Sequence, residues 1–521
     1  MKNKLAILLA AALGLAACSD KYLNVEPSGG TLSKDQFQKL ENTVAPSIAG
    51  IYSNMYAYGG EHDLFGQRCI DLKTDILSGD VALTGTTYGW FSADEQMLTS
   101  SYYTGYFWSY YYDIIHNANV ILNTLDLTSD VSKKVAEYGL PSDGNKEHFT
   151  DQELVDGGYY AEVYAIRAYA YLGLVRVYSE AYDEIDDPAA RLCVPLYTAD
   201  NALALEPQGL SSVEEVYDMI ESDLNTSVDY FDAFKPARAS KLRIDINVAR
   251  GLLANAYLNH LDYDHAYEVA KKAIEANAYT ILPNKELLTT GFADVSHTSW
   301  MWGQDVDVET TTGLASFFGQ VDIHTYSYAQ AGDVKAIDET LLNSIPSWDG
   351  RKRWFVTDKK DKYYGAPTRK FYNLGSANTT GEADVDRNWL NDNVFMRIES
   401  VYLMAAEAAL LKSTPDLTEA AKYLTAITDE RIDTTATAAA DYAAYKATLN
   451  TTDALRTAIE YNWRVEMWGE GYGLQTFRRL TKTKKRGGNH YYYAGQDVHS
   501  SDVYFTFERP TSEDNYNPNI K

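Results

Sequence analysis

The chain has 521 residues, of which 45% are hydrophobic and 23% charged, so it is long enough to bury a large core and too apolar for a disordered chain. Acidic residues outnumber basic ones by 73 to 46, and the formal net charge of -27 would repel a phosphate backbone, which argues against nucleic acid as a partner. A mean hydropathy of -0.35 excludes a multi-span membrane protein. Tyrosine is unusually common, with 42 copies against 16 of phenylalanine, and its ring with a polar tip suits surfaces that are both apolar and wet.

The N-terminus has the pattern of an export signal. Lys2 and Lys4 precede the apolar run LAILLAAALGLAA at 5–17, which is too short to span a bilayer permanently. The string LAAC, ending at Cys18, resembles a bacterial lipobox, and the following SDKYL resembles the acidic signal that sends some lipoproteins to the cell surface. We therefore predict a signal peptide at 1–17 and a lipid anchor on Cys18, holding the protein at the outer membrane and facing the cell exterior. The alternative is an ordinary secretory signal with an incidental cysteine.

Apolar and small residues recur at helical spacing in pairs of segments. The clearest pair is 249–257 with 266–274, where the pattern i, i+3, i+4, i+7, i+8 is repeated 17 positions later, half of the 34-residue tetratricopeptide period. Each such helix can bury its apolar face only against a neighbour, which makes the array a scaffold. Three further pairs are 398–405 with 417–424, 161–175 with 213–224, and 455–463 with 470–480. None carries the full tetratricopeptide consensus.

We therefore predict a mainly α fold, with a degenerate tetratricopeptide-like scaffold of helical hairpins and long irregular loops in a single large domain, 18–521. The helical parts are expected at about 34–57, 100–125, 158–278 and 395–480. The loop-rich parts, which would form the ligand side, are expected at about 58–97, 125–157, 281–395 and 484–521.

No motif for catalysis or metal binding stands out. No two histidines are three or four positions apart, and neither a phosphate-binding P-loop nor a G-x-S-x-G elbow is present. Gly469, Gly471 and Gly473 form a glycine cluster, but it does not follow a strand as a phosphate cradle would. Carboxylate pairs for glycoside hydrolysis cannot be singled out among 73 acids. We expect no cofactor, no metal and no enzyme activity, and we expect Cys69 and Cys193 to be separate buried thiols rather than a disulfide.

Three strings in order resemble the helices of one family. They are AEVYAIRAYAYLGLVRVYSEAY at 161–182, FMRIESVYLMAAEAAL at 395–410 and RVEMWGEGYGLQTFRRL at 464–480. Together with the lipobox, they make the chain resemble the RagB/SusD family of surface nutrient-binding lipoproteins. Tyr472 and Gly473 replace the basic residue and its neighbour in the family pattern, and the C-terminal tail lacks the usual ending.

The resemblance implies a function and a partner. The protein would capture oligosaccharides at the cell surface and act as a lid on a SusC-like TonB-dependent outer-membrane transporter, through which the glycan is imported. Two alternatives stay open: a surface glycoside hydrolase on a helical scaffold, and an interaction scaffold that stabilises the transporter without reading a ligand.

The first candidate ligand-binding segment is the loop SGDVALTGTTYGWFSAD at 78–94, which contains Asp80, Tyr88 and Trp90. It places two aromatic rings among Gly, Thr and Asp, with few apolar neighbours. A pyranose stacks its C–H face on an aromatic ring, and its hydroxyl groups bind polar side chains. In the starch-binding member of the family, the matching loop also follows an L-x-T-D string and supplies such rings; here that string is LKTD at 72–75.

The second candidate segment runs from Trp300 to Tyr328 and supplies Trp302, Asp305 and Tyr326. Alternation around Trp300 and Trp302 indicates one face of a strand, for which burial in the core is the simpler interpretation. Exposed members of the segment would form the opposite wall of a ligand site. The predicted ligand-binding residues are therefore Tyr88, Trp90, Asp80, Trp302, Asp305 and Tyr326.

Overall fold

The computed structural model describes residues 43–202, 206–289, 292–371 and 390–520. Residue contacts divide the chain into a unit of residues 1–47, described only over 43–47, and a unit of residues 48–521. Cys18 and the first part of the helix predicted at 34–57 lie outside the described residues. Within the described ranges, no helix is both long enough and apolar enough to cross a membrane.

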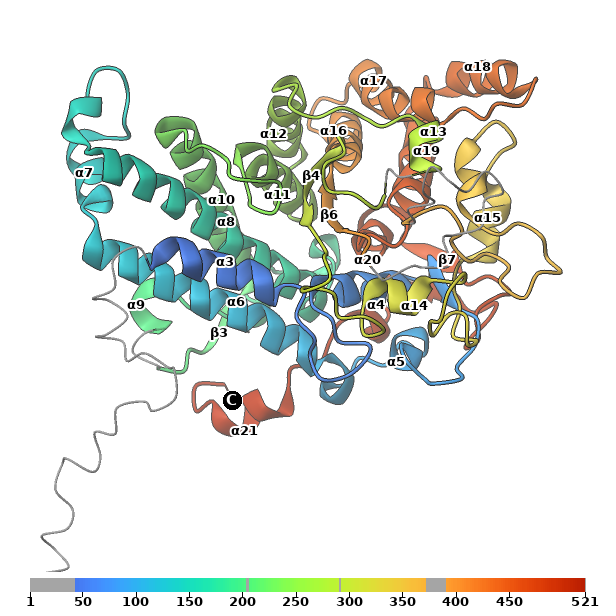
Figure 1. The fold of residues 1–521 in the computed structure, drawn as a ribbon, viewed down its shortest axis with the longest axis horizontal. Helices are drawn as coiled ribbons and strands as arrows, with labels where there is room; N and C mark the ends of the chain where they lie inside the picture. The colour runs from blue at the N-terminus through green and yellow to red at the C-terminus, as the bar shows by residue number, and fades with distance from the viewer. Residues whose placement is uncertain (1–42, 203–205, 290–291, 372–389, 521) are drawn as a thin grey trace, which may run out of the picture. The chain divides into compact units, whose positions relative to one another are not determined.

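The predicted helical hairpins are confirmed. Each helix of the array packs on the next, in the order α8, α10, α11, α12, α16, α17, and α19 packs on α16 and α17 (Figure 1). Small residues allow this close packing, since Ala256 and Ala270 are fully buried. The bounds of these helices are α8 (Asp151–Tyr178), α10 (Val213–Phe234), α11 (Ile246–Asn259), α12 (Tyr263–Glu275), α16 (Ile398–Leu411), α17 (Leu417–Thr428) and α19 (Thr452–Glu466).

The helices begin where the sequence supplies a capping side chain. Thr150 and Ser212 each accept a hydrogen bond from the backbone N–H three residues on, and the glutamate at that position bonds back, which forms a capping box. At α11, α12 and α17 the capping group is the carboxylate of Asp245, Asp262 and Asp416, which accepts hydrogen bonds from backbone N–H groups of the first turn. These caps satisfy N–H groups that would otherwise lack a partner.

Short elements lie in the segments between the long helices. Four two-stranded antiparallel sheets are described, pairing β1 with β5, β2 with β3, β4 with β6 and β7 with β8. The strands are β1 (Val81–Leu83), β2 (Leu192–Pro195), β3 (Leu210–Ser212), β4 (Trp300–Gln304), β5 (Lys335–Ile337), β6 (Asn393–Arg397), β7 (Thr483–Lys485) and β8 (Asp497–His499). The other α-helices are α3 (Val44–Asn54), α4 (Gln67–Ser78), α5 (Ser92–Glu95), α6 (Ser101–Thr128), α7 (Val131–Tyr138), α9 (Ala199–Ala202), α13 (Asn284–Leu287), α14 (Phe317–Val321), α15 (Glu339–Ser344), α18 (Ala438–Thr448), α20 (Gly473–Thr476) and α21 (Thr511–Tyr516). Single turns of other helix types are Lys146–His148, Tyr182–Glu184, Gly350–Trp354, Asp429–Arg431, Phe477–Thr481 and Val503–Phe505.

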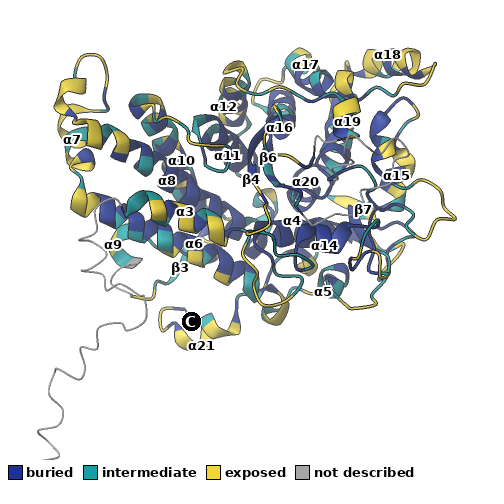
Figure 2. Cartoon of the chain, viewed as in Figure 1, coloured by how far each residue is buried: buried dark blue, intermediate teal, exposed yellow. Residues whose placement is uncertain are grey.

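Two segments are more helical than the sequence predicts. In the segment 58–97, which was expected to be loop-rich, α4 spans Gln67–Ser78 and is buried along its whole length. Residues 125–157 were expected to be loop-rich, but α6 continues to Thr128, α7 occupies Val131–Tyr138 and α8 already begins at Asp151. The helix α7 is short and largely exposed, with Val131 as its one buried residue, so its eight residues give only a brief pattern (Figure 2).

Buried charges hold the C-terminal half of the scaffold together. The fully buried carboxylate of Glu466 accepts hydrogen bonds from Arg431 at 2.8 and 2.9 Å, from Arg397 at 3.2 Å and from Arg351 at 3.2 Å. These residues come from four separate segments of the chain. Because each charge has a bonded partner of opposite sign, the network is compatible with burial.

The glycine cluster binds an internal carboxylate. The backbone N–H groups of Gly471 and Gly473 donate to the carboxylate of Asp75 at 3.1 and 2.7 Å. Burial raises the pKa of Asp75 to about 7, and these two hydrogen bonds lower it. The L-x-T-D string and the C-terminal motif, almost 400 residues apart, therefore meet in a structural contact.

Both remaining cysteines are free and buried, as predicted. Burial raises the pKa of Cys69 and of Cys193 to about 12, so neither thiol is ionised at neutral pH.

Candidate ligand-binding site

A short strand pair brings two distant loops together. In the antiparallel pairing of β1 with β5, Leu83 lies opposite Lys335, so the loop that follows β1 and the loop that precedes β5 leave the same end. The N–H of Thr84 continues the pairing by donating to the carbonyl of Val334 at 2.9 Å. The loops then approach so closely that a Cβ at residue 85 would lie 2.3 Å from the carbonyl oxygen of Gly332, which explains glycine at position 85. At position 332 the backbone has a φ of +121°, which favours glycine.

Asp333 fixes the loop that follows β1. Its carboxylate, which is fully buried, accepts hydrogen bonds from the backbone N–H of Tyr88 at 3.0 Å and from the N–H of Thr87. Hydrogen bonds from N–H groups to a charged carboxylate are stronger than those between neutral groups. The backbone at Tyr88 is thereby held in one place, and its side chain, 58% exposed, projects into solvent.

Aromatic side chains from three loops gather above this anchor. The ring of Tyr328 meets the rings of Tyr88, Trp90 and His62 edge to face, with centroids 5.1, 5.9 and 5.6 Å apart. The Tyr58 ring meets His62 edge to face at 6.1 Å. We call the following residues the aromatic platform: Tyr58, His62, Tyr88, Trp90, Tyr326 and Tyr328.

Tyr328 is the buried centre of the platform. Its hydroxyl shares a hydrogen bond of 2.6 Å with Nδ1 of His62. Burial is the main cause that raises the pKa of Tyr328, and the indole N–H of Trp90 lowers it. The phenols of Tyr326 and Tyr88 raise this pKa further.

Polar residues beneath the platform hold the third loop. The side-chain amide of Gln320, on α14, donates to the backbone carbonyl of His62 at 2.8 Å, and its oxygen accepts from Nζ of Lys335 at 2.8 Å. Lys335 is fully buried. Burial lowers the pKa of Lys335 to about 7, against the effect of the nearby carboxylates of Asp333 and Asp63. The buried side chains of Gln320 and Lys335 therefore lie under the loops at 58–62 and 84–90.

The exposed part of the platform consists of phenol rings. Tyr58, Tyr88 and Tyr326 are 49%, 58% and 70% exposed, whereas Trp90 and His62 are half-buried and Tyr328 is buried. Large exposed aromatic side chains that are fixed from below offer flat apolar faces with polar edges. Such a surface can stack a flat or ring-shaped ligand and bind hydroxyl groups around it.

Two of the predicted ligand-binding residues, Tyr88 and Trp90, contact Tyr328 in the platform. Tyr326 is exposed and lies two residues before Tyr328 in the chain. Asp305 is exposed just after β4, and no contact joins it to the platform within the part of the chain that the structure describes. Burial raises the pKa of Asp392 to about 6, and the negative charge of Asp305 contributes to this rise.

The structure corrects the prediction for Asp80 and Trp302. Asp80 is 3% exposed, and its carboxylate accepts hydrogen bonds at 2.9 Å from Arg464 and from Lys484, so it serves the scaffold. Trp302 is 1% exposed and packs against the rings of Tyr169 and Phe395, with centroids 5.3 and 5.1 Å away. Neither side chain presents a surface to a ligand.

The sequence reasoning missed Tyr58 and His62. Both lie in the segment 58–97 that was expected to be loop-rich on the ligand side, but no local pattern distinguishes them from other exposed polar residues. Tyr328 belonged to the second candidate segment and was not singled out, because its role as the centre of the platform depends on contacts with two other loops.

Two family models match the chain. One, described as "Starch-binding associating with outer membrane", matches residues 21–261, and the other, described as "SusD family", matches residues 355–519. A comparison with curated proteins finds no match.

Solved structures share the fold over nearly the whole chain. A SusD-like carbohydrate-binding protein from Bacteroides vulgatus is 19% identical with a TM-score of 0.68, over 92% of this chain and 96% of its own. A SusD superfamily protein from Bacteroides thetaiotaomicron is 20% identical with a TM-score of 0.68, over 92% and 98%. A further SusD superfamily protein from Bacteroides vulgatus is 19% identical with a TM-score of 0.69, over 92% and 97%.

The fold is thus that of the SusD-like helical proteins, mainly α and with a single large body of helices, as the sequence predicts. With a SusD-type model matched at each end of the chain, the protein belongs to the SusD/RagB family.

Proposed function

We propose that the protein binds a glycan without cleaving it and that the sugar stacks on Tyr88 and Tyr326 of the aromatic platform. The observation that carries this proposal is the convergence of exposed aromatic rings from separate loops on one buried foundation, with Asp333 holding the loop of Tyr88. A patch of large exposed apolar side chains, unlike a single one, is typical of a binding surface. The description of the N-terminal family model as starch-binding supports the same class of ligand.

The chemistry of the platform suits weak and reversible capture. Each ring that stacks on the C–H face of a pyranose contributes on the order of 1 kcal/mol beyond the area that it buries. A few such contacts give dissociation constants of roughly micromolar to millimolar. Affinity in this range lets a surface protein collect an oligosaccharide and then release it to another protein.

We further infer that Cys18 carries a lipid and that the protein faces the cell exterior at the outer membrane. The lipobox-like string at Cys18 and the acidic residue after it support this, as does the family description, which names the outer membrane. Several acyl chains would be needed for a stable anchor, because a single chain binds membranes only marginally. The partner would be a SusC-like TonB-dependent transporter that imports the bound glycan.

Two measurements on the chain lacking residues 1–18 test the proposed function. A glycan array identifies the oligosaccharides that bind, and chromatography after long incubation shows whether each of these is cleaved. We expect binding to at least one neutral glycan family and unchanged oligosaccharide. Release of shorter sugars would show a glycoside hydrolase instead. Absence of binding, together with a stable complex with the transporter, would show an interaction scaffold.

Two further experiments test the location and the partner. Cys18→Ala should abolish metabolic labelling with a fatty acid and release the protein from membranes, and external protease should cut the wild-type protein on whole cells. Affinity purification from solubilised outer membranes should recover the transporter with the wild type. An intact surface protein under conditions that cut other surface proteins would contradict the location.

A further inference from the structure

A second group of exposed tyrosines lies in the loop between β7 and β8. The loop has the sequence RGGNHYYYAGQ at 486–496, in which Tyr491 and Tyr493 are 54% and 49% exposed and Tyr492 is half-buried. The ring of Tyr491 meets the ring of Tyr492 edge to face, with centroids 4.9 Å apart. None of these three residues belongs to the aromatic platform.

The loop is bonded to the strand that leads into the platform. The backbone N–H of Tyr491 donates to the carbonyl of Leu83, the last residue of β1, at 2.8 Å, and the N–H of Thr84 donates to Val334, next to β5. These two groups of β1 belong to one trans peptide, so they point in opposite directions, and Tyr491 lies on the edge of β1 away from β5. Adjacent strands are roughly 5 Å apart, so roughly 10 Å separates the backbone of Tyr491 from β5. A short run of linked sugar rings can cover this distance.

A buried histidine fixes the loop to the elements on both sides of the platform. His490 is 4% exposed, and its Nδ1 and Nε2 share hydrogen bonds with Glu95 at 2.8 Å and with Asp338 at 3.2 Å. Glu95 belongs to α5, which follows the loop of Tyr88 and Trp90, and Asp338 directly follows β5. Burial opposes a charge on His490, but its hydrogen bonds to the two carboxylates hold its pKa above the usual value.

The carboxylate of Glu95 also joins the loop to β1. Its Oε2 accepts hydrogen bonds from the backbone N–H of Leu83 at 3.2 Å and from the guanidinium of Arg486 at 3.0 Å. Glu95 is fully buried, so these bonds are shielded from water. The tyrosines of the β7–β8 loop and the aromatic platform therefore share one buried foundation.

We propose that Tyr491 and Tyr493 form a second stacking surface, which extends the glycan site across β1 and makes the protein prefer long glycan chains to short ones. This inference rests on the proposed function, because the platform would bind one part of the chain and the tyrosines of the β7–β8 loop the next part. Rings that are fixed before binding lose little conformational freedom, so each further ring that stacks on a sugar adds affinity.

The test is a titration of the chain lacking residues 1–18 with one linear glycan of increasing length. The series is maltose, maltotetraose and maltohexaose, because the N-terminal family model is described as starch-binding, or the same lengths of the linear glycan that binds most strongly on the array. The wild type should bind the longest member about tenfold more tightly than the shortest. Equal affinity for all lengths, or no binding of any glycan on the array, would overturn the proposal.

Variants of the two exposed tyrosines assign this gain to the loop. Tyr491→Ala should bind the shortest member like the wild type and lose most of the gain with length, and Tyr493→Ala should do the same. Tyr491→Phe keeps the ring and should keep the gain. Circular dichroism should show intact folding, since both side chains are about half exposed. A wild-type gain with length in both folded alanine variants would overturn the proposal.

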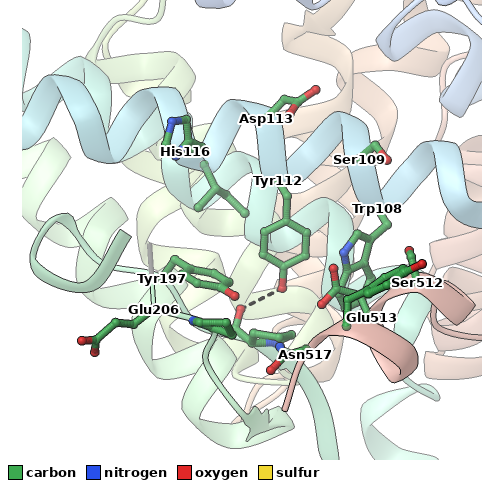
Figure 3. Close-up of a pocket in the computed structure, with 14 residues that line it drawn as sticks. Trp108, Ser109, Tyr112, Asp113, His116, Tyr197, Glu206, Ser512, Glu513 and Asn517 are labelled. Carbon is green, nitrogen blue, oxygen red and sulfur yellow. Dashed lines mark hydrogen bonds between the residues drawn. The ribbon is translucent and has the colours of Figure 1, made fainter. Parts of the chain in front are cut away.

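The control is an exposed tyrosine at a different aromatic pocket. This pocket, of about 440 Å³, lies between α6 and α21, and in it Tyr112 stands between Trp108 and Tyr197 (Figure 3). Tyr516 lines it and is 84% exposed. Tyr516→Ala should keep the wild-type affinity at every length. Loss of the gain in Tyr516→Ala would assign the far end of the glycan to this pocket and overturn the proposal.

The same titrations separate this site from the platform. Tyr88→Ala should weaken binding at every length, whereas Tyr491→Ala should weaken only the binding of the longer members. Wild-type affinity at every length in Tyr88→Ala would contradict the proposed function and, with it, this inference. Weaker binding in Tyr88→Ala with a wild-type gain in Tyr491→Ala would contradict this inference alone. Unchanged glycan affinity in Tyr491→Ala with loss of the co-purified transporter would assign the loop to the transporter and also overturn it.

Discussion

The imidazole of His62 stacks on the indole of Trp90, with ring centroids 5.7 Å apart and ring planes within 11° of parallel. One face of Trp90 is therefore covered by the protein itself, and Tyr328 meets the indole edge to face. The sequence indicated that Trp90 would be a free stacking surface in a polar loop. In the structure Trp90 supports the platform, and the exposed rings beside it are better placed to meet a ligand.

This arrangement predicts different effects for the two aromatic residues of the loop. Trp90→Ala should lower the free energy of unfolding by about 1–3 kcal/mol, because a half-buried indole leaves a gap between His62 and Tyr328. Tyr88→Ala should change it by less than about 0.5 kcal/mol, because the side chain is mostly exposed. Urea unfolding monitored by circular dichroism measures both, and equal stability of the two variants would contradict the assigned burial.

Asp333 should matter for binding through the backbone that it holds. Asp333→Asn replaces one acceptor oxygen by a donor that faces the N–H groups of Thr87 and Tyr88, so we expect a loss of about 1–3 kcal/mol in stability and weaker glycan binding. Asp361→Asn is the control, since that exposed carboxylate also accepts a backbone N–H, from Tyr363 at 2.9 Å, away from the platform. Glycan affinity equal to the wild type in Asp333→Asn would show that the loop does not need this anchor.

Lys335 should give the stability of the protein a recognisable pH dependence. Burial lowers its pKa from 10.5 to about 7 in the folded chain, so between these values the unfolded chain binds a proton that the folded chain does not. Lys335 therefore makes stability rise with pH over this range, by up to about 1.4 kcal/mol per pH unit. Its cost is fully present below about pH 7 and has vanished above about pH 10.5.

The check is urea unfolding of the wild type and of Lys335→Met between about pH 7 and 10. The variant should lose the upward slope that Lys335 contributes, whereas Lys359→Met, at an exposed lysine paired with Glu339, should keep it. Parallel curves for the wild type and Lys335→Met would show that the lysine stays charged when it is buried.

Glu466 should be among the residues most sensitive to substitution in the scaffold. Glu466→Gln leaves the guanidinium groups of Arg351, Arg397 and Arg431 with one buried negative charge fewer, and removing one partner of a buried ion pair typically costs about 3–5 kcal/mol. Asp130→Asn is the control, because its pair with Lys133 is exposed and should contribute little to stability. A thermal midpoint of Glu466→Gln within error of the wild type would contradict the role of the network.

The helical scaffold was predictable because its signal is local. The repeat of small and apolar residues at 249–257 and 266–274 is a property of each helix alone, and the structure has α11 and α12 there with Ala256 and Ala270 buried. The helix α7 was not predicted, because its eight residues are too few for the apolar spacing to stand out from the polar residues around it.

The site was predictable only in part, because it depends on contacts between distant segments. Tyr88 and Tyr326 stand in polar loops, and that local context indicates exposure. The alternation around Trp302 predicts a strand with one buried face, whereas both faces of β4 are buried in the structure. Asp80 looks like a ligand residue in its loop. Its ion pairs with Arg464 and Lys484 join segments 384 and 404 residues apart in the chain, so only the fold shows them.

The central claim is that the exposed tyrosines of the platform bind the glycan. Calorimetric titration of Tyr88→Ala/Tyr326→Ala with an array-positive oligosaccharide tests it most directly, with Tyr102→Ala as the control, because Tyr102 is 87% exposed on α6 and is not part of the platform. The account predicts a loss of about 1–3 kcal/mol in binding free energy, roughly five- to 150-fold in affinity, with unchanged unfolding and an unchanged control. Wild-type affinity in the folded double variant, or an equal loss in Tyr102→Ala, would contradict it.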